Sequence, residues 1–109
     1  MFLDKKLVKG EIYMNPEEVG NRLKSIMHLK GLRREDVAKR MKISYASLTR
    51  KLNGKREFNI KDILKLKEIL ELDGDFGTNI FFNPDFTIEN IKEKYAIEIF
   101  NKEPSEKAK

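Results

Sequence analysis

Residues 31–56 read GLRREDVAKRMKISYASLTRKLNGKR and predict two short helices, a tight turn between them and a basic loop after them. Val37 and Met41 lie four residues apart, which places them on the same face of the first helix. Leu48 and Leu52 repeat this spacing in the second helix. Two short amphipathic helices joined in this way are typical of a helix-turn-helix unit.

Helix-starting and helix-ending residues define the limits of the two helices. The first helix is expected to start near Arg33 or Arg34, and the turn falls at residues 42–43. Ser44 is a good N-cap for the second helix, because its hydroxyl accepts a hydrogen bond from an otherwise unpaired backbone N–H. Gly54 is suited to the left-handed conformation that commonly ends a helix.

Positive charge is concentrated in the same part of the chain. Residues 1–56 hold 15 Lys and Arg against 6 Asp and Glu, whereas residues 57–109 hold 8 against 12. Within residues 22–56 the count is 12 basic side chains to 2 acidic ones. A solvated basic face would explain this excess, but its coincidence with a helix-turn-helix pattern favours binding to DNA phosphates.

A longer set of short motifs carries a resemblance to a known family. The motifs, in chain order, are Leu23, Lys30-Gly31-Leu32, Val37-Ala38, Ile43-Ser44, Leu48 and Asn53-Gly54-Lys55-Arg56. With this order and spacing, residues 16–72 resemble the lambda-repressor/Cro-like (XRE) helix-turn-helix family of transcriptional regulators. Arg33-Arg34 and Lys42 depart from the family's frequent Thr-Gln and Gly. The run from Arg50 to Phe58 looks like a prophage and mobile-element subgroup.

The resemblance implies which side chains touch DNA. Base contacts are expected from the outer face of the second helix, at Tyr45, Ala46, Thr49 and Arg50. Arg50 is the first candidate, because a guanidinium can bind guanine O6 and N7 together, although a phosphate contact is the alternative. Packing over the start of the preceding helix is the alternative for Tyr45. Contacts to the DNA backbone are expected from Arg33, Arg34, Ser47, Asn53, Lys55 and Arg56.

The whole chain is predicted to be all-α, with a four- to five-helix lambda-repressor-like DNA-binding domain and short appendages at both ends. A small β element in the appendages is left open. The expected divisions are residues 1–14 as an arm or short strands, 15–82 as the helix-turn-helix domain, 83–100 as a C-terminal extension and 101–109 as a disordered tail. The extension either forms a dimer contact or folds back on the same chain and pairs with residues 7–13, and both alternatives remain open.

Helices outside the central motif are expected from about residue 16 to 30, from 60 or 61 to 72, and over 75–82. The core stripe of the middle one is expected at Ile60, Ile63, Leu64, Leu66 or Lys67, and Leu70. Residues 86–100 fit helical spacing at first and then alternate like a strand, so both structures remain open there.

Composition argues against several other classes of protein. The chain has 109 residues, of which 38% are charged and none is Cys, so neither disulfides nor a Cys-based metal site is expected. His28 is the only His and has no neighbouring ligand in sequence, and no catalytic set of residues is apparent. No cofactor and no enzymatic activity are therefore expected. No apolar run approaches the roughly 18 residues that span a bilayer, and a cytoplasmic location is expected.

The resulting interpretation is a sequence-specific, double-stranded-DNA-binding transcriptional regulator that acts as a homodimer, and the resemblance points to a phage- or mobile-element-type repressor. The competing interpretation is a protein-interaction module on the same scaffold, such as an antitoxin or an inhibitor of a host factor, which would use residues 75–100. Non-specific binding to nucleic acid, including RNA, is a third option.

Overall fold

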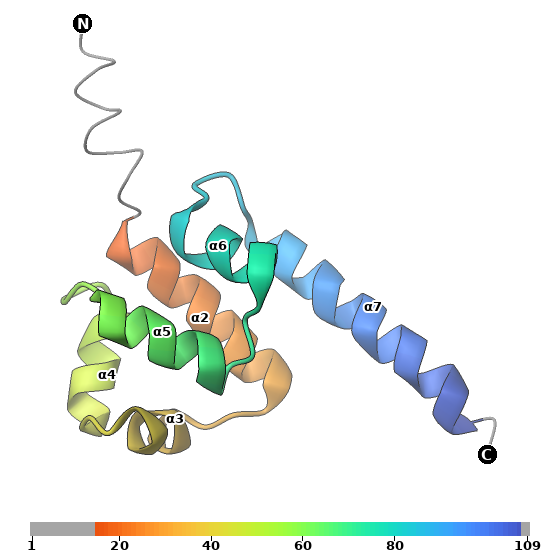
Figure 1. Ribbon diagram of the computed structural model, residues 1–109, viewed down its shortest axis with the longest axis horizontal. Helices are drawn as coiled ribbons and strands as arrows, with labels where there is room; N and C mark the ends of the chain where they lie inside the picture. The colour runs from red at the N-terminus through yellow and green to blue at the C-terminus, as the bar shows by residue number, and fades with distance from the viewer. Residues whose placement is uncertain (1–14, 108–109) are drawn as a thin grey trace, which may run out of the picture.

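The computed structural model describes the backbone of residues 15–107 and the side chains of residues 15–98. This part of the chain contains helices and no strand, which confirms the all-α prediction (Figure 1). The helices are α2 (Pro16–Lys30), α3 (Arg34–Met41), α4 (Tyr45–Leu52), α5 (Ile60–Ile69), α6 (Gly74–Phe82) and α7 (Ile88–Lys107). The predicted arm or strands at 1–14 lie outside the described residues.

α2 runs through the middle of the molecule, with α3 and α4 on one side of it and α6 and α7 on the other (Figure 1). Asn15 caps this helix by accepting a hydrogen bond from the Glu17 N–H at 2.8 Å, and Pro16 occupies its first turn. The chain leaves α2 through Gly31, whose φ of 71° is the left-handed conformation that ends many helices. The predicted helix over residues 16–30 is thereby confirmed.

A single hydrophobic core joins all six helices. Its fully buried side chains, each less than 2% exposed, are Leu23, Ile26, Val37, Met41, Leu48, Leu52, Leu66, Leu70, Leu72, Ile80 and Ile91. Each helix from α2 to α7 supplies at least one of these side chains. The core therefore fixes α4 relative to the rest of the molecule by the same contacts that stabilise the fold.

Two helix backbones approach each other closely where α2 meets the end of α4. A Cβ atom built on Gly20 would lie 1.9 Å from the Leu52 carbonyl oxygen, a distance no side chain can occupy. Gly20 therefore lets the α2 backbone contact the α4 backbone directly. This contact sets the position of α4 without an intervening side chain.

The tight turn between α3 and α4 is made by residues 42–43, as predicted. Lys42 has a φ of 63°, so it adopts the left-handed conformation at the position where the family that the sequence resembles often has Gly. The Ile43 N–H donates to the Ala38 carbonyl at 3.1 Å, and Ser44 accepts from the Ser47 N–H at 3.0 Å. α4 is thus capped by Ser44 as the sequence predicts.

The predicted core stripe of α5 is wrong at two positions. Ile60 is 74% exposed and Leu64 is 59% exposed, whereas Leu66 and Leu70 are fully buried. The helix also ends at Ile69, before the expected residue 72. Because the buried face of α5 runs through Leu66, Ile69 and Leu70, the row of Ile60 and Leu64 faces solvent.

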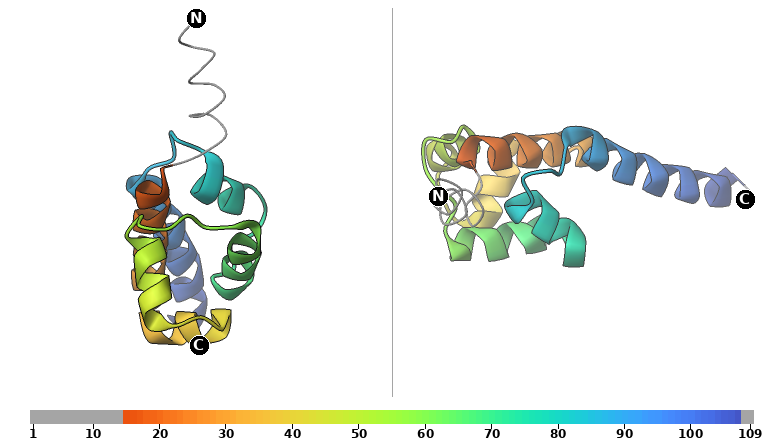
Figure 2. Two further views of the ribbon diagram at one scale, coloured as in Figure 1. Left: turned by 90° about the vertical axis from the view of Figure 1, so that its left-hand side faces the viewer. Right: turned by 90° about the horizontal axis from the view of Figure 1, so that it is seen from above.

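Residues 88–107 form one helix, α7, which resolves the choice between helix and strand at residues 86–100 (Figure 2). Ile91 and Tyr95 are buried, whereas Ile97 is 58% exposed. The first turns of α7 therefore pack against the body and the later turns extend away from it. Residues 101–107, predicted as part of a disordered tail, continue the backbone of this helix.

Candidate nucleic-acid interface

α4 turns one face to the core and the other to solvent. Leu48 and Leu52 are fully buried, whereas Tyr45, Ala46 and Arg50 are exposed. Thr49 is half-buried on the same outer side. In Figure 1, α4 lies at the edge of the molecule, on the side away from α7. The structure thus brings the four predicted base-contacting residues together on one accessible face of a short helix.

The N-terminus of α3 lies next to this face. Arg33 is the exposed N-cap residue of α3, and its side chain makes no capping hydrogen bond. Arg34, the first residue of α3, reaches across to α4 and donates from Nη1 to the Thr49 hydroxyl oxygen at 3.4 Å. Its guanidinium carbon lies 6.0 Å from the centre of the Tyr45 ring. The Tyr45 ring therefore borders the start of α3 while remaining 51% exposed.

The loop after α4 supplies the other predicted backbone-contacting residues. Asn53, Lys55 and Arg56 are all exposed. The Asn53 side-chain oxygen accepts from Lys24 Nζ at 2.9 Å, so a further cation from α2 stands at this end of α4. Gly54 has a φ of 79°, which turns the chain so that the Lys55 N–H donates to the Arg50 carbonyl at 2.8 Å.

Ser47 lies between the two predicted sets of contacts. Its backbone N–H donates to the Ser44 hydroxyl oxygen, and its side chain is partly buried at the start of α4. Exposed cations therefore flank α4 at both ends, and Arg50 adds a further cation on its outer face beside Tyr45, Ala46 and Thr49. A helix with this distribution can face base edges in its centre and phosphates at its ends.

One family model matches the part of the chain that contains α3 and α4. Residues 22–74 match the family model of the Cro/C1-type HTH DNA-binding domain. No curated protein and no solved structure gave a significant match to the chain. The matched segment begins in α2 and ends at the start of α6, so it contains α3, α4 and the basic loop. The family match and the exposed face of α4 together support a DNA-binding regulator.

One lysine of the matched segment has a structural role. Lys51 is 8% exposed, and its Nζ lies 2.6 Å from Asp62 Oδ2 on α5. Asp62 also accepts from the Asn59 N–H, which completes a capping box at the start of α5. Sequence reasoning left Lys51 undecided between phosphate contact and solvated surface. The only signal for a partner was an Asp 11 residues later, which is too common a spacing to indicate a contact.

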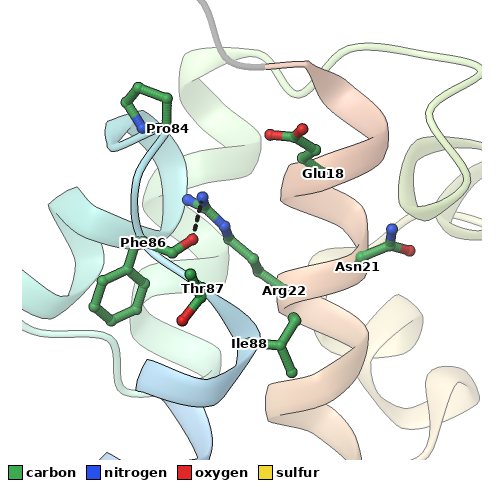
Figure 3. Close-up of a pocket in the computed structure, with 7 residues that line it drawn as sticks. All are labelled: Glu18, Asn21, Arg22, Pro84, Phe86, Thr87 and Ile88. Atoms are coloured by element: carbon green, nitrogen blue, oxygen red, sulfur yellow. Dashed lines mark hydrogen bonds between the residues drawn. The ribbon is translucent and has the colours of Figure 1, made fainter.

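Arg22, at the start of the matched segment, is also a structural residue that sequence reasoning missed. It is 4% exposed, and its guanidinium donates to the carbonyl oxygens of Asn79 at 2.7 Å and Ile80 at 3.0 Å. It also donates to the Phe86 carbonyl, as Figure 3 shows. Burial lowers the pKa of Arg22 from its ordinary value, and the charge of Glu18 opposes that change. Arg22 thus holds the end of α6 and the following loop against α2.

The cavity beside Arg22 is small, with a volume of about 230 Å³. It is lined by Glu18, Asn21, Arg22, Pro84, Phe86, Thr87 and Ile88 (Figure 3). His28 is exposed on α2. Among residues 15–107, no group of three or more potential metal ligands is found, and no helix there is long and apolar enough to cross a membrane.

Proposed function

We propose that this protein is a sequence-specific DNA-binding transcriptional regulator, of the phage or mobile-element repressor type, which reads DNA with α4. The observation that carries the proposal is the exposed outer face of α4 inside a segment that matches the Cro/C1-type DNA-binding domain. A helix that is anchored by one face and free on the other can enter the major groove, where the four base pairs are distinguishable.

In this proposal, α4 meets base edges and its flanking segments hold the phosphates. The base-reading residues are Tyr45, Ala46, Thr49 and Arg50. Arg33, Ser47, Asn53, Lys55 and Arg56 contact the backbone, and Arg34 is considered further below. Bound in this way at a promoter, the protein would repress transcription in the cytoplasm by blocking access of RNA polymerase.

We further propose that the protein binds DNA as a homodimer. Residues 15–82 would form the DNA-binding domain, and residues 83–100 would provide the dimer contact. Phe82 is 49% exposed and Ile97 is 58% exposed, which is consistent with apolar surface that a second copy covers. A two-fold dimer would place its two copies of α4 about 34 Å apart, on successive turns of the major groove.

Binding to DNA fragments from the protein's own promoter region, compared with random DNA, tests the proposal. Wild-type protein should prefer one fragment, and Arg50→Ala should weaken that binding about 10- to 100-fold, because a bidentate arginine–guanine contact is lost. Lys92→Ala is the control, since Lys92 is exposed on α7. Equal affinity of the wild type for all fragments would reject sequence-specific regulation.

The same apolar side chains favour a second candidate function, a protein-interaction module that acts through residues 75–100. In that case Phe82→Ser would abolish binding of a protein partner and leave the DNA assay unchanged. Loss of dimerisation together with weaker operator binding would instead favour the regulator.

A further inference from the structure

The Arg34 side chain points from α3 onto the outer face of α4. Arg34 belongs to α3, yet its side chain lies over two of the residues on the outer face of α4. Nη1 donates to the Thr49 hydroxyl at 3.4 Å, and the guanidinium carbon is 6.0 Å from the centre of the Tyr45 ring. Tyr45 and Thr49 are one helical turn apart, so the guanidinium spans the gap between them.

These two contacts orient the guanidinium and leave donors available. A guanidinium has five N–H groups in a planar fork, and the contact to Thr49 uses one group on Nη1. The Tyr45 ring and the Thr49 hydroxyl restrict the side chain before any DNA is present. A long side chain that is already restricted loses less conformational freedom when it binds.

The neighbouring arginines are placed differently. Arg33 is exposed at the N-cap of α3, and Arg40 is exposed in the last turn of the same helix. Neither side chain has a hydrogen bond to α4 among the contacts that the structure shows for the described residues. Of the three arginines of this segment, Arg34 is therefore the one that the structure connects to the base-reading face.

We propose that Arg34 reads a guanine base in the major groove, as an extension of the surface formed by Tyr45 and Thr49. This inference rests on the proposed function. Its guanidinium would donate to guanine O6 and N7, beside the base pair that Arg50 contacts. DNA recognition would then come from two helices, with α3 supplying one specific contact in addition to its phosphate contacts.

A panel of operator duplexes tests this assignment. The preferred site of the wild-type protein is first selected from random DNA, and each of its guanines is then replaced singly by 7-deazaguanine, which lacks the N7 acceptor but keeps every phosphate. Dissociation constants are measured for wild type, Arg34→Gln, Arg34→Lys and the control Arg40→Gln. Thermal melts of each variant confirm that it is folded.

One guanine position should depend on Arg34. Its replacement should weaken wild-type and Arg40→Gln binding about 10-fold, whereas Arg34→Gln, already weakened about 10- to 100-fold on the intact site, should be insensitive to it. Arg34→Lys should not restore wild-type affinity, because an ammonium lacks the planar fork.

Uniform behaviour would overturn the assignment. If Arg34→Gln weakens binding to all duplexes by the same factor, keeps its sensitivity to every 7-deazaguanine and is rescued by Lys, Arg34 is a phosphate contact. If the wild type selects no preferred site at all, the proposed function fails instead, so the two failures are distinguishable.

Discussion

The ion pair of Lys51 and Asp62 helps to fix the position of α4 relative to α5. Lys51 belongs to the last turn of α4, and Asp62 belongs to the first turn of α5. Both side chains are only 10% exposed, and Lys51 also donates to the Glu57 carbonyl at 3.4 Å. The pair therefore connects α4, the helix that we propose reads bases, to α5 across the basic loop.

Breaking this pair should be costly. Lys51→Met leaves a buried carboxylate without its cation, and we expect a loss of about 3 kcal/mol in the free energy of unfolding. Urea denaturation measures the loss. The double variant Lys51→Met, Asp62→Asn should recover at least half of it, because no unpaired charge remains. Lys61→Met, at an exposed position of α5, is the control. A loss below about 1 kcal/mol would mean that water solvates the pair.

A substitution at Lys42 is expected to raise the stability of the protein. Its φ of 63° is strained for a residue with a Cβ, so Lys42→Gly should raise the free energy of unfolding by about 0.5–1 kcal/mol. Thermal unfolding measures the effect. Lys39→Gly, inside α3, is the matched control and should destabilise by about 1 kcal/mol. A lower melting temperature for Lys42→Gly would contradict the argument from backbone strain.

At the scale of elements, capping residues and helical spacing predict the features of a helix that depend on nearby residues. Ser44 and Gly54 each act as predicted, because a cap depends on neighbours within a few residues. The solvent-facing row of α5 was predicted wrongly, since Ile60 and Leu64 have the same spacing as a core stripe. Spacing alone cannot say which of two apolar rows meets the core.

Contacts between distant parts of the chain were beyond sequence reasoning. The acceptors of Arg22 lie 57 to 64 residues further along, and its own neighbours in α2 give no sign of them. The positions of the site residues on α4 followed from helical spacing. The approach of Arg34 to Thr49 depends on the angle between α3 and α4, which the sequence does not state.

The packing of α7 on α2 should be sensitive to alkaline pH. Burial, and then the charges of Glu98, Glu71 and Asp73, raises the pKa of Tyr95 to about 12 from an ordinary value of 10.0. The unfolded chain loses this proton at lower pH than the folded one. The contribution of Tyr95 to stability is therefore complete below pH 10 and is lost as the pH rises from about 10 to about 12.

Tyr95→Phe tests this dependence because it keeps the ring and removes the titrating hydroxyl. Urea midpoints at pH 9 and pH 11 should fall less in Tyr95→Phe than in the wild type, and the difference isolates Tyr95 from the lysines that titrate in both. Identical falls in the two proteins would show that the hydroxyl reaches water in the folded state.

At the scale of the whole molecule, charge is divided between the two halves of the sequence. The basic half contains the segments that we propose to face DNA, and the half from residue 57 onward carries a net negative charge. The separation would orient the protein as it approaches DNA, since the acidic part is repelled by the phosphates. The effect of any one cation should then depend on its position more than on its charge.

Lys55→Gln should weaken binding to cognate and random DNA alike. It should also reduce the slope of the logarithm of affinity against the logarithm of salt concentration by about 0.9, the value for one released counterion. Lys92→Gln removes the same charge from α7 and should leave the slope unchanged. An unaltered slope in Lys55→Gln would place Lys55 away from the phosphates.

The contact between Gly20 and Leu52 also bears on how such a protein can be re-engineered. The α4 backbone is held mainly by its inner residues and by a glycine on another helix, and the outer face adds the contacts of Tyr45 and Thr49 with Arg34. The outer-face side chains can therefore be substituted together while the buried contacts that position α4 are kept. Libraries randomised at positions 45, 46, 49 and 50, with position 20 kept as Gly, should yield folded proteins with new operator preferences.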